Sequence, residues 1–288
     1  MPKSALRLTN RRVRLLVGLL VAGLLFAHLS GQMEARPRSA EAYALADETV
    51  HLADRDLQSR MERWAATDHV KLLELCLEHY RRNIHDYRCT FTKQERIGGT
   101  LRGAQEMAVK FLHEPFSVAM RWTRNAPVGD RILYVDGKYA GDMLIHLKSG
   151  FLRAVAGDPV RRKPDCAEAM KKTRRPVTMF GFENALQSLL EVYRAAADSG
   201  DLSQSFEGYF EMAGRKTIKL CRVLPPKEGY PAHRTFVYVD LEHLVPICIE
   251  AHDWKGKLTS QYRYSDVQFN VGLRPADFEP EACGIARP

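Results

Sequence analysis

The sequence lacks the short motifs that mark the common enzyme active sites. It contains no G-x-S-x-G nucleophile turn, no phosphate-binding P-loop, no H-E-x-x-H zinc motif and no glycine-rich dinucleotide-binding fingerprint. Its six cysteines have no C-x-x-C spacing of the kind found in metal and redox sites. The motifs therefore give no strong signal for catalysis, for a metal or for a cofactor.

The chain also lacks concentrated positive charge outside its N-terminus. The formal net charge is +8, but residues 1–31 hold five cations and no acid, so the remainder carries only +3. No stripe of lysine and arginine alternates with aromatic residues, and we therefore expect no nucleic-acid partner. The basic runs at residues 161–163 and 171–175 are more typical of a solvated surface than of a phosphate site, and they leave an anionic membrane surface open.

Long apolar runs are absent except near the N-terminus. Residues 15–29 are predominantly apolar and follow five cations, which is the pattern of a secretory signal. The run is short for a membrane span, which needs about 20 apolar residues. We predict that residues 1–31 are a signal peptide, with an inner-membrane anchor through residues 15–29 as the alternative. In both cases the chain is exported to the periplasm, and the lack of a cysteine after the run excludes a bacterial lipoprotein.

The cysteines differ in their surroundings. Cys89, Cys221 and Cys248 fall in predicted strands, where a thiol behaves as a small buried apolar group. Cys166 and Cys283 fall in loop-like sequence and are the better candidates for a disulfide in an exported protein.

The most informative part of the sequence is residues 87–147, where apolar and polar residues alternate through several short runs. A period of two is typical of strands with one apolar face and one face in water. Pairs such as Gly98-Gly99 and Asp136-Gly137 separate the runs and favour tight turns. We therefore predict an antiparallel meander whose apolar face must be covered. That face carries Cys89, Phe91, Met107, Val109, Phe111, Phe116, Val118, Met120 and Trp122, opposed by Thr90, Thr92, Lys110, Ser117, Arg121 and Thr123.

Helical patterns precede and follow this meander. Apolar residues recur at three- and four-residue steps in residues 68–83, with Asp68 as the candidate N-cap, and again in residues 184–193. A further helical pattern covers residues 49–66. Residues 151–175 carry many charges and several prolines, and are predicted to be a long irregular connection.

The second half of the chain is again rich in strand patterns, at residues 205–212, 216–224, 234–240, 245–254 and 258–269. The order helix, meander, helix, meander predicts an α+β fold. Its centre is one strongly curved antiparallel sheet, a half-barrel of about ten strands, with helices covering the concave face. We expect residues 1–31 to be the signal or anchor, 32–67 a partly helical extension and 68–288 a single half-barrel domain.

Two polar pairs interrupt the strand patterns. Glu250 and His252 point to the same side of one strand while Asp253 points away, and two potential ligands are too few for a metal site. We favour a polar surface strand there over an enzyme centred on His252. Lys93 and Glu95 lie on the apolar face of an earlier strand. They mark either the wet end of that strand, which we favour, or a polar pair at the mouth of a cavity.

The apolar concave face is the candidate functional surface. If helices fill it completely, its side chains are only core. If they leave a void, methionine and aromatic side chains line a pocket suited to an acyl chain. Burial contributes about 0.8 kcal/mol per methylene, so a tail of roughly sixteen carbons offers on the order of ten kcal/mol before ordering costs. The candidate ligand-binding residues are Phe91, Val109, Phe111, Val118, Met120, Trp122, Ile132 and Tyr134.

Spaced residues in several parts of the chain form a pattern typical of a known family. They are Tyr87-x-Cys89-x-Phe91-x-Lys93-x-Glu95, Val109-Lys110-Phe111, Pro115-Phe116-x-Val118-x-Met120-Arg121-Trp122, Gly129-x-Arg131, Tyr134-Val135-x-Gly137-Lys138, Pro176-Val177 with Gly181-Phe182, and Tyr264-x-Asp266-x-x-x-Asn270-x-Gly272-Leu273-x-x-x-Asp277-Phe278. Over residues 73–280 the chain resembles an uncharacterised bacterial domain-of-unknown-function family, number fifteen-seventy-one. More distantly, the strand order and the stretch from Pro115 to Trp122 resemble periplasmic lipoprotein carriers of the LolA type.

The distant resemblance implies a LolA-like half-open barrel, with helices as a lid over an apolar cavity, and lipid or lipoprotein binding outside the cytoplasm. The leading hypothesis is therefore an exported, non-catalytic, carrier-like protein that binds a lipid or the acyl chain of a lipoprotein. It would contact the membrane transiently or through its N-terminal segment. The alternative is a periplasmic sensor or envelope protein-interaction module with the same fold and a protein partner. Neither hypothesis involves a cofactor, a metal, a catalytic residue or nucleic acid.

Overall fold

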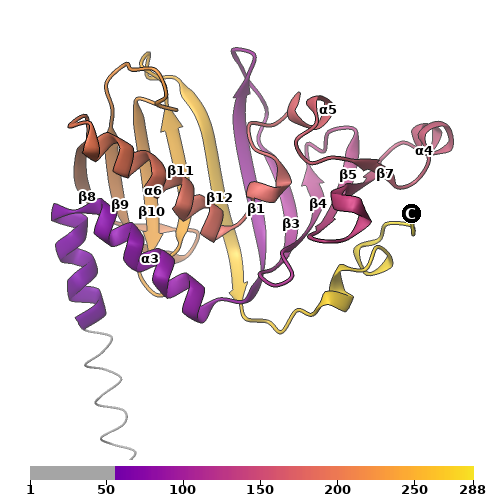
Figure 1. Cartoon of the computed structure of the whole chain (residues 1–288), viewed down its shortest axis with the longest axis horizontal. Helices are drawn as coiled ribbons and strands as arrows, with labels where there is room; N and C mark the ends of the chain where they lie inside the picture. The colour runs from indigo at the N-terminus through magenta and orange to yellow at the C-terminus, as the bar shows by residue number, and fades with distance from the viewer. Residues whose placement is uncertain (1–55) are drawn as a thin grey trace, which may run out of the picture. The chain divides into compact units, whose positions relative to one another are not determined.

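The computed structural model describes residues 56–288, which form an α+β structure (Figure 1). The predicted signal peptide or anchor at residues 1–31 and the extension up to residue 55 lie outside the described residues. Within the described part, no helix is long and apolar enough to cross a membrane.

One antiparallel sheet of twelve strands organises the described chain. Its order is β7-β6-β5-β4-β3-β1-β12-β11-β10-β9-β8, with β2 paired to β1 alone. The first and last long strands, β1 and β12, pair in the middle and join two meanders. The strands are β1 (Asp86–Ile97), β2 (Thr100–Leu101), β3 (Gln105–Leu112), β4 (Ser117–Arg124), β5 (Gly129–Val135), β6 (Met143–Leu147), β7 (Val160–Arg162), β8 (Ser203–Met212), β9 (Arg215–Val223), β10 (Arg234–Asp240), β11 (Pro246–His252) and β12 (Leu258–Phe269).

The structure confirms the predicted fold class and the antiparallel sheet, with two differences in detail. The sheet has twelve strands where about ten were expected, because β2 and β7 are too short to show alternation. The connection predicted to be irregular contains short elements. The helices are α3 (His69–Asn83), α4 (Gly150–Ala156), α5 (Ala167–Met170) and α6 (Phe182–Asp198), with 3-10 turns η1 (Tyr139–Gly141), η2 (Val177–Met179), η3 (Pro275–Phe278) and η4 (Glu281–Cys283).

Helices α3 and α6 pack together over one face of the sheet, on the side of β8–β12 (Figure 1). As predicted, Asp68 caps α3, because its carboxylate accepts a hydrogen bond from the Lys71 backbone N at 3.1 Å. Ion pairs from Arg81 to Glu183 and from Arg194 to Glu74 join the two helices, each at 2.7 Å. We call the sheet face that bears α3 and α6 the concave face.

The topology explains why α6 crosses this face. Strands β7 and β8 are consecutive in the chain but form opposite edges of the sheet. The chain between them must therefore run across the sheet, and α6 is its longest part. Its buried stripe contains Phe182, Leu186, Leu189, Leu190, Tyr193 and Ala196.

Residues 56–67, which the sequence assigned to an extension, are helical and join the core. Met61 and Ala65 are buried in the same apolar cluster as Leu72 and Leu73 of α3. The compact unit of the described chain accordingly begins at Leu57.

The opposite, convex face of β3–β6 is only partly open to water, whereas the sequence placed all of it in solvent: Arg121 and Thr123 are exposed there, but other positions are not. Ser117 and Ala119 are both buried, although alternation placed this face in solvent. The reason is that the C-terminal segment packs against it and forms a second apolar cluster. That cluster contains Leu112, Ala119, Leu133, Val135, Leu144, Leu273, Phe278 and Ile285.

All six cysteines are unbonded. Cys166 and Cys283, the disulfide candidates, are half-buried and not paired with each other. Cys89, Cys221 and Cys248 are buried, as predicted for small apolar groups. Burial also raises the pKa of the Cys248 thiol to about 11, so it is protonated at neutral pH.

Candidate functional site

A cavity of about 800 Å³ lies on the concave face. Known ligand pockets have volumes of about 300–1,000 Å³. Residues 160–181, which we call the cover segment, form much of its outer wall together with α4 and α6. Its inner wall includes side chains from strands as far apart in the sheet as β6 and β9. The sheet must therefore curve around the cavity.

The wall formed by β3–β6 and α4 is almost wholly apolar. Period-two alternation brings these side chains to one face, since residues two apart on a strand point the same way. Methionine and aromatic groups make this wall adaptable and large in area. It contains Met107, Met120, Trp122, Pro127, Val128, Gly129, Ile132, Met143, Ile145, Leu147, Leu152 and Ala156, with Gln105 as its polar member.

The structure divides the eight residues proposed from the sequence into two groups of four. Those that line the cavity are Phe91, Met120, Trp122 and Ile132. Those that are not among its lining residues are Val109, Phe111, Val118 and Tyr134, and these are buried in packed surroundings. Ligand contact stays a prediction for both groups.

Aromatic side chains of the protein itself occupy the space next to the second group. The ring of Phe111 stacks on Tyr87 with centroids 4.7 Å apart and meets the edge of Phe116 at 5.5 Å. Gly181, at φ 108°, brings the start of α6 onto this cluster, and a Cβ there would lie 3.0 Å from Phe111 Cε2. Glycine is needed for both the positive φ and the close approach.

Lys93 and Glu95 lie in the cavity wall, so the interpretation that they mark the wet end of a strand is wrong. The Glu95 side chain is only 4% exposed. It accepts hydrogen bonds from Tyr262 Oη at 2.6 Å and from the Arg174 backbone N at 3.2 Å, and Lys93 Nζ lies 3.4 Å away. Lys93 also donates to Thr173 Oγ1 at 3.0 Å. These contacts fasten the cover segment to the sheet.

Sequence reasoning missed the contribution of the second meander. Arg222, Thr235, Ile249 and Tyr262 also line the cavity, but all eight candidate residues were sought in the first meander. A signal was present in β9, where Arg222 follows Ile218 and Leu220 at two-residue steps. A cation at the third position of an apolar alternation must face the same side as its apolar neighbours.

Glu250 and His252 face away from the cavity. They lie on the same side of β11, as predicted, with His252 Nε2 3.2 Å from Glu250 Oε1. Asp253 instead shapes the next turn by accepting from the backbone N of Lys255 and Lys257 at 2.9 and 2.8 Å. Neither Glu250 nor His252 is among the cavity-lining residues.

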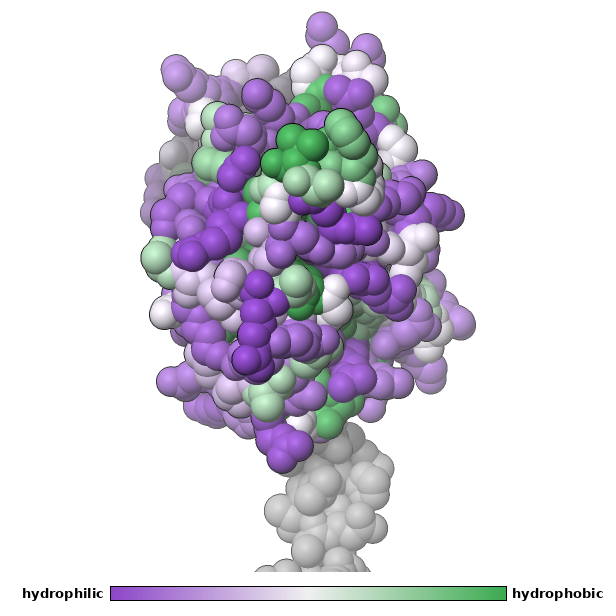
Figure 2. All heavy atoms as spheres, turned by 90° about the vertical axis from the view of Figure 1, so that its right-hand side faces the viewer, coloured by the Kyte–Doolittle hydropathy of each residue, from purple (hydrophilic) through white to green (hydrophobic). Residues whose placement is uncertain are grey.

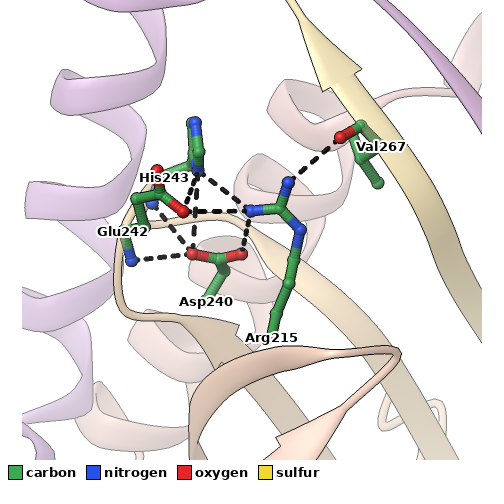
Figure 3. Close-up of polar contacts among 5 residues, drawn as sticks. All are labelled: Arg215, Asp240, Glu242, His243 and Val267. Carbon is green, nitrogen blue, oxygen red and sulfur yellow. Dashed lines mark hydrogen bonds and ion pairs between the residues drawn. The ribbon is translucent and has the colours of Figure 1, made fainter.

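Asp240, Glu242 and His243 are the one group among residues 56–288 that brings together three potential metal ligands (Figure 3). Asp240 shapes a tight turn here, because its Oδ1 accepts from the backbone N of Glu242 and of His243. Arg215 Nη1 lies 2.8 Å from Asp240 Oδ2 and 3.5 Å from Glu242 Oε2 (Figure 3). The guanidinium thus supplies the positive charge that a metal would bring.

Helix α4 presents apolar side chains on both of its sides. Leu152 and Ala156 face the cavity, whereas Phe151 and Val155 are 75% and 71% exposed. Figure 2 shows hydrophobic residues surrounded by hydrophilic ones on the side of the molecule where α4 lies.

Residues 84–283 match the model of the family described as "Protein of unknown function (DUF1571)". The match spans more than half of the chain. The chain belongs to this family. The resemblance noted from the sequence is thereby confirmed. No curated protein matches the sequence significantly.

Several solved structures are similar at low identity. One is a chain of the Pseudomonas aeruginosa MucA/MucB complex, with 15% identity, a TM-score of 0.43 and coverage of 75% of this chain and 62% of that chain. Another is a putative outer membrane lipoprotein-sorting protein domain from Vibrio parahaemolyticus, with 15% identity, a TM-score of 0.35 and coverage of 73% and 97%. A LolA superfamily protein from Nitrosomonas europaea has 11% identity, a TM-score of 0.30 and coverage of 73% and 98%. The chain spans 63% of the length of MucB, less than two thirds.

Proposed function

We propose that this protein is an exported, non-catalytic binding protein that holds a lipid, or the acyl chain of a lipoprotein, in the cavity of its concave face. The observation that carries the proposal is the void itself, about 800 Å³ with a continuous apolar wall from β3 to β6. The apolar side chains of this wall have few protein atoms to contact on the cavity side, which limits their packing energy. A hydrocarbon chain would restore those contacts and bury methylenes at about 0.8 kcal/mol each.

Export is proposed from the N-terminal sequence. Residues 1–31 combine five cations, no acid and a central apolar run, which is typical of a secretory signal or a short anchor. An exported carrier meets lipid at membrane surfaces, and the exposed apolar side chains of α4 beside the cavity suit such a contact.

The direct test is to purify the full-length protein, extract it with organic solvent and identify bound lipid by mass spectrometry. Stoichiometric lipid or acyl chains are expected in the extract. The purified protein should also bind a fluorescent fatty acid after the native lipid is removed. A protein that yields no lipid and binds no fatty acid would contradict the proposal.

A pair of tryptophan substitutions tests whether the fatty acid binds in the cavity. Ile132→Trp adds bulk to the apolar wall and should weaken fatty-acid binding by about tenfold or more, since overpacked apolar space excludes a ligand. Arg121→Trp adds the same ring to an exposed position on the convex face of β4, and should leave binding unchanged. Recovery of one stable envelope protein without lipid would favour the sensor or interaction-module hypothesis instead.

A further inference from the structure

Arg222 is a buried cation in the wall of the cavity whose hydrogen-bonding groups are mostly unused. Its side chain belongs to β9, is 2% exposed and lines the cavity. Nη2 donates to Thr235 Oγ1 at 3.0 Å, but Nε and Nη1 have no partner. Buried polar groups in native proteins almost always have partners, so an unpaired cation in the wall of a cavity calls for an explanation, and a bound anionic group would supply one.

The surroundings of Arg222 hold the guanidinium in place without neutralising it. Its Cζ lies 4.8 Å from the centroid of the Tyr193 ring, which is a cation–π contact. The Tyr193 hydroxyl in turn lies 3.3 Å from His69 Nδ1. Burial lowers the pKa of Arg222, but a guanidinium remains protonated in proteins. The side chain is therefore fixed, charged and buried.

No acidic side chain among residues 56–288 pairs with Arg222. The two acids of the cavity wall are Glu95 and Glu168. Glu95 is already bound by Lys93, Tyr262 and the Arg174 backbone, and Glu168 is exposed on the cover segment. Arg215, on the same strand, is the opposite case, because Asp240 and the Val267 carbonyl bind its guanidinium.

We infer that the ligand of this cavity is an amphiphile with an acidic group, a carboxylate or a phosphate, and that Arg222 binds this group while the hydrocarbon tail lies along the apolar wall of β4–β6. The inference rests on the proposed function and narrows its ligand class. Carboxylates and phosphates are the groups that an arginine fork binds most strongly. The positions agree with this orientation, since Arg222 and Thr235 lie on β9 and β10, whereas Trp122, Ile132 and Ile145 lie on β4–β6.

The test compares three ligands with the same twelve-carbon chain on the delipidated full-length protein. They are dodecanoate, dodecyl phosphate and the neutral dodecanol, titrated below micelle formation and followed by calorimetry or tryptophan fluorescence. At least one of the two acids should bind about tenfold or more tightly than dodecanol, in line with charge-assisted hydrogen bonds. The acid that binds more tightly distinguishes a fatty acid from a phosphate-bearing lipid.

Two variants separate ligand binding from a structural role. Arg222→Met should abolish the preference for acids while dodecanol binding stays within about threefold, because only the charge interaction is removed. The ligand-free variant should be at least as stable as the wild type, since replacing an uncompensated buried charge by an apolar side chain is often neutral or stabilising. Arg121→Met removes an exposed cation from the convex face and should change neither property.

The outcomes of this test and of the proposed function are distinguishable. If no twelve-carbon ligand binds the wild type, the proposed function fails. If the twelve-carbon ligands bind but the acids and dodecanol bind equally well, the proposed function stands and the role of Arg222 is overturned. The same holds if Arg222→Met keeps the preference for acids. A strongly destabilised Arg222→Met whose stability Arg222→Lys restores, with no acid preference in any variant, would assign Arg222 a structural role only.

Discussion

The two halves of the concave face are covered in different ways. Over β8–β12, the long amphipathic helices α3 and α6 place side chains such as Leu186 and Tyr193 directly on the sheet, and these are fully buried. Over β3–β6, the cover consists of short elements, and wall residues such as Trp122 and Ile132 stay half-buried around a void. The long apolar helices pack directly on the sheet, whereas the short, charged cover segment leaves a cavity beneath it, whose wall extends as far as α6 and β9.

The second half compensates for its void on its other face. The C-terminal segment packs Leu273, Phe278 and Ile285 against the convex side of β3–β6. The strands that line the cavity are therefore supported from behind. A sheet that has a core on one face can leave the other face open for a ligand.

The strongest test of this difference is Phe182→Ala in the helix-covered half. Phe182 is fully buried, with its ring 4.3 Å from Tyr264 and 5.0 Å from Tyr87. The substitution should lower the free energy of unfolding by about 3–5 kcal/mol, because it leaves a cavity in packed core. Urea denaturation measures this loss. Val155→Ala on exposed α4 is the control and should stay within about 0.5 kcal/mol of the wild type.

Two neighbouring residues of β5 test the other half directly. Leu133 points into the convex cluster and is fully buried, whereas Ile132 points into the cavity and is half-buried. Leu133→Ala should therefore cost about 2–5 kcal/mol and Ile132→Ala less than about 1.5 kcal/mol in the ligand-free protein. Equal losses in urea denaturation would mean that the concave side of β5 is packed as tightly as its convex side.

The elements themselves were predictable from local sequence. Strands β10 (Arg234–Asp240) and β12 (Leu258–Phe269) have the bounds that alternation and turn residues predict. The cap of α3 at Asp68 follows likewise from a local hydrogen bond. Periodicity and capping depend on residues only a few positions apart, so both can be predicted from the local sequence.

The coverage of each face was not predictable in the same way. Val118 and Trp122 lie on the same face of β4, yet only Trp122 lines the cavity. Val118 belongs to the packed core because the start of α6, far along the chain, closes over that end of the sheet. Ala119 is buried in a cluster with Leu273 and Phe278 of the C-terminal segment, which is still more distant. Alternation predicts which side chains share a face but not which segment covers it.

A smaller effect is expected from the contacts that fasten the cover segment. Glu95→Gln removes the negative charge that holds Lys93, Tyr262 and the Arg174 backbone. Stability should fall by about 1.5–3 kcal/mol, the range for hydrogen bonds to a charged group. Hydrogen exchange should accelerate in residues 163–176 before it does in α6. Glu250→Gln on the convex face is the matched control, and the same acceleration in that variant would count against the role of Glu95.

The smallest expected effect is a pH dependence confined to the helix-covered half. His69 is buried, with Nε2 2.9 Å from the Ala65 carbonyl and Nδ1 3.3 Å from Tyr193 Oη. The carbonyl can only accept, so Nε2 carries the proton and Nδ1 accepts from the tyrosine hydroxyl. Burial lowers the pKa of His69 below its ordinary value of 6.5, so the folded state favours the neutral ring.

The sign of this dependence follows from proton linkage. The unfolded chain binds the proton more readily, so stability is fully present above pH 6.5 and declines as the pH falls below it, until the folded pKa is passed. One proton limits the slope to about 1.4 kcal/mol per pH unit. His69→Gln should flatten the slope of the unfolding free energy between pH 7 and pH 5, with a remainder from His79, whose pKa burial also lowers. Hydrogen exchange in acid should rise first in α3 and α6. If it rises first in β4–β6 instead, protonation weakens the cavity half and the assignment of this effect to His69 is wrong.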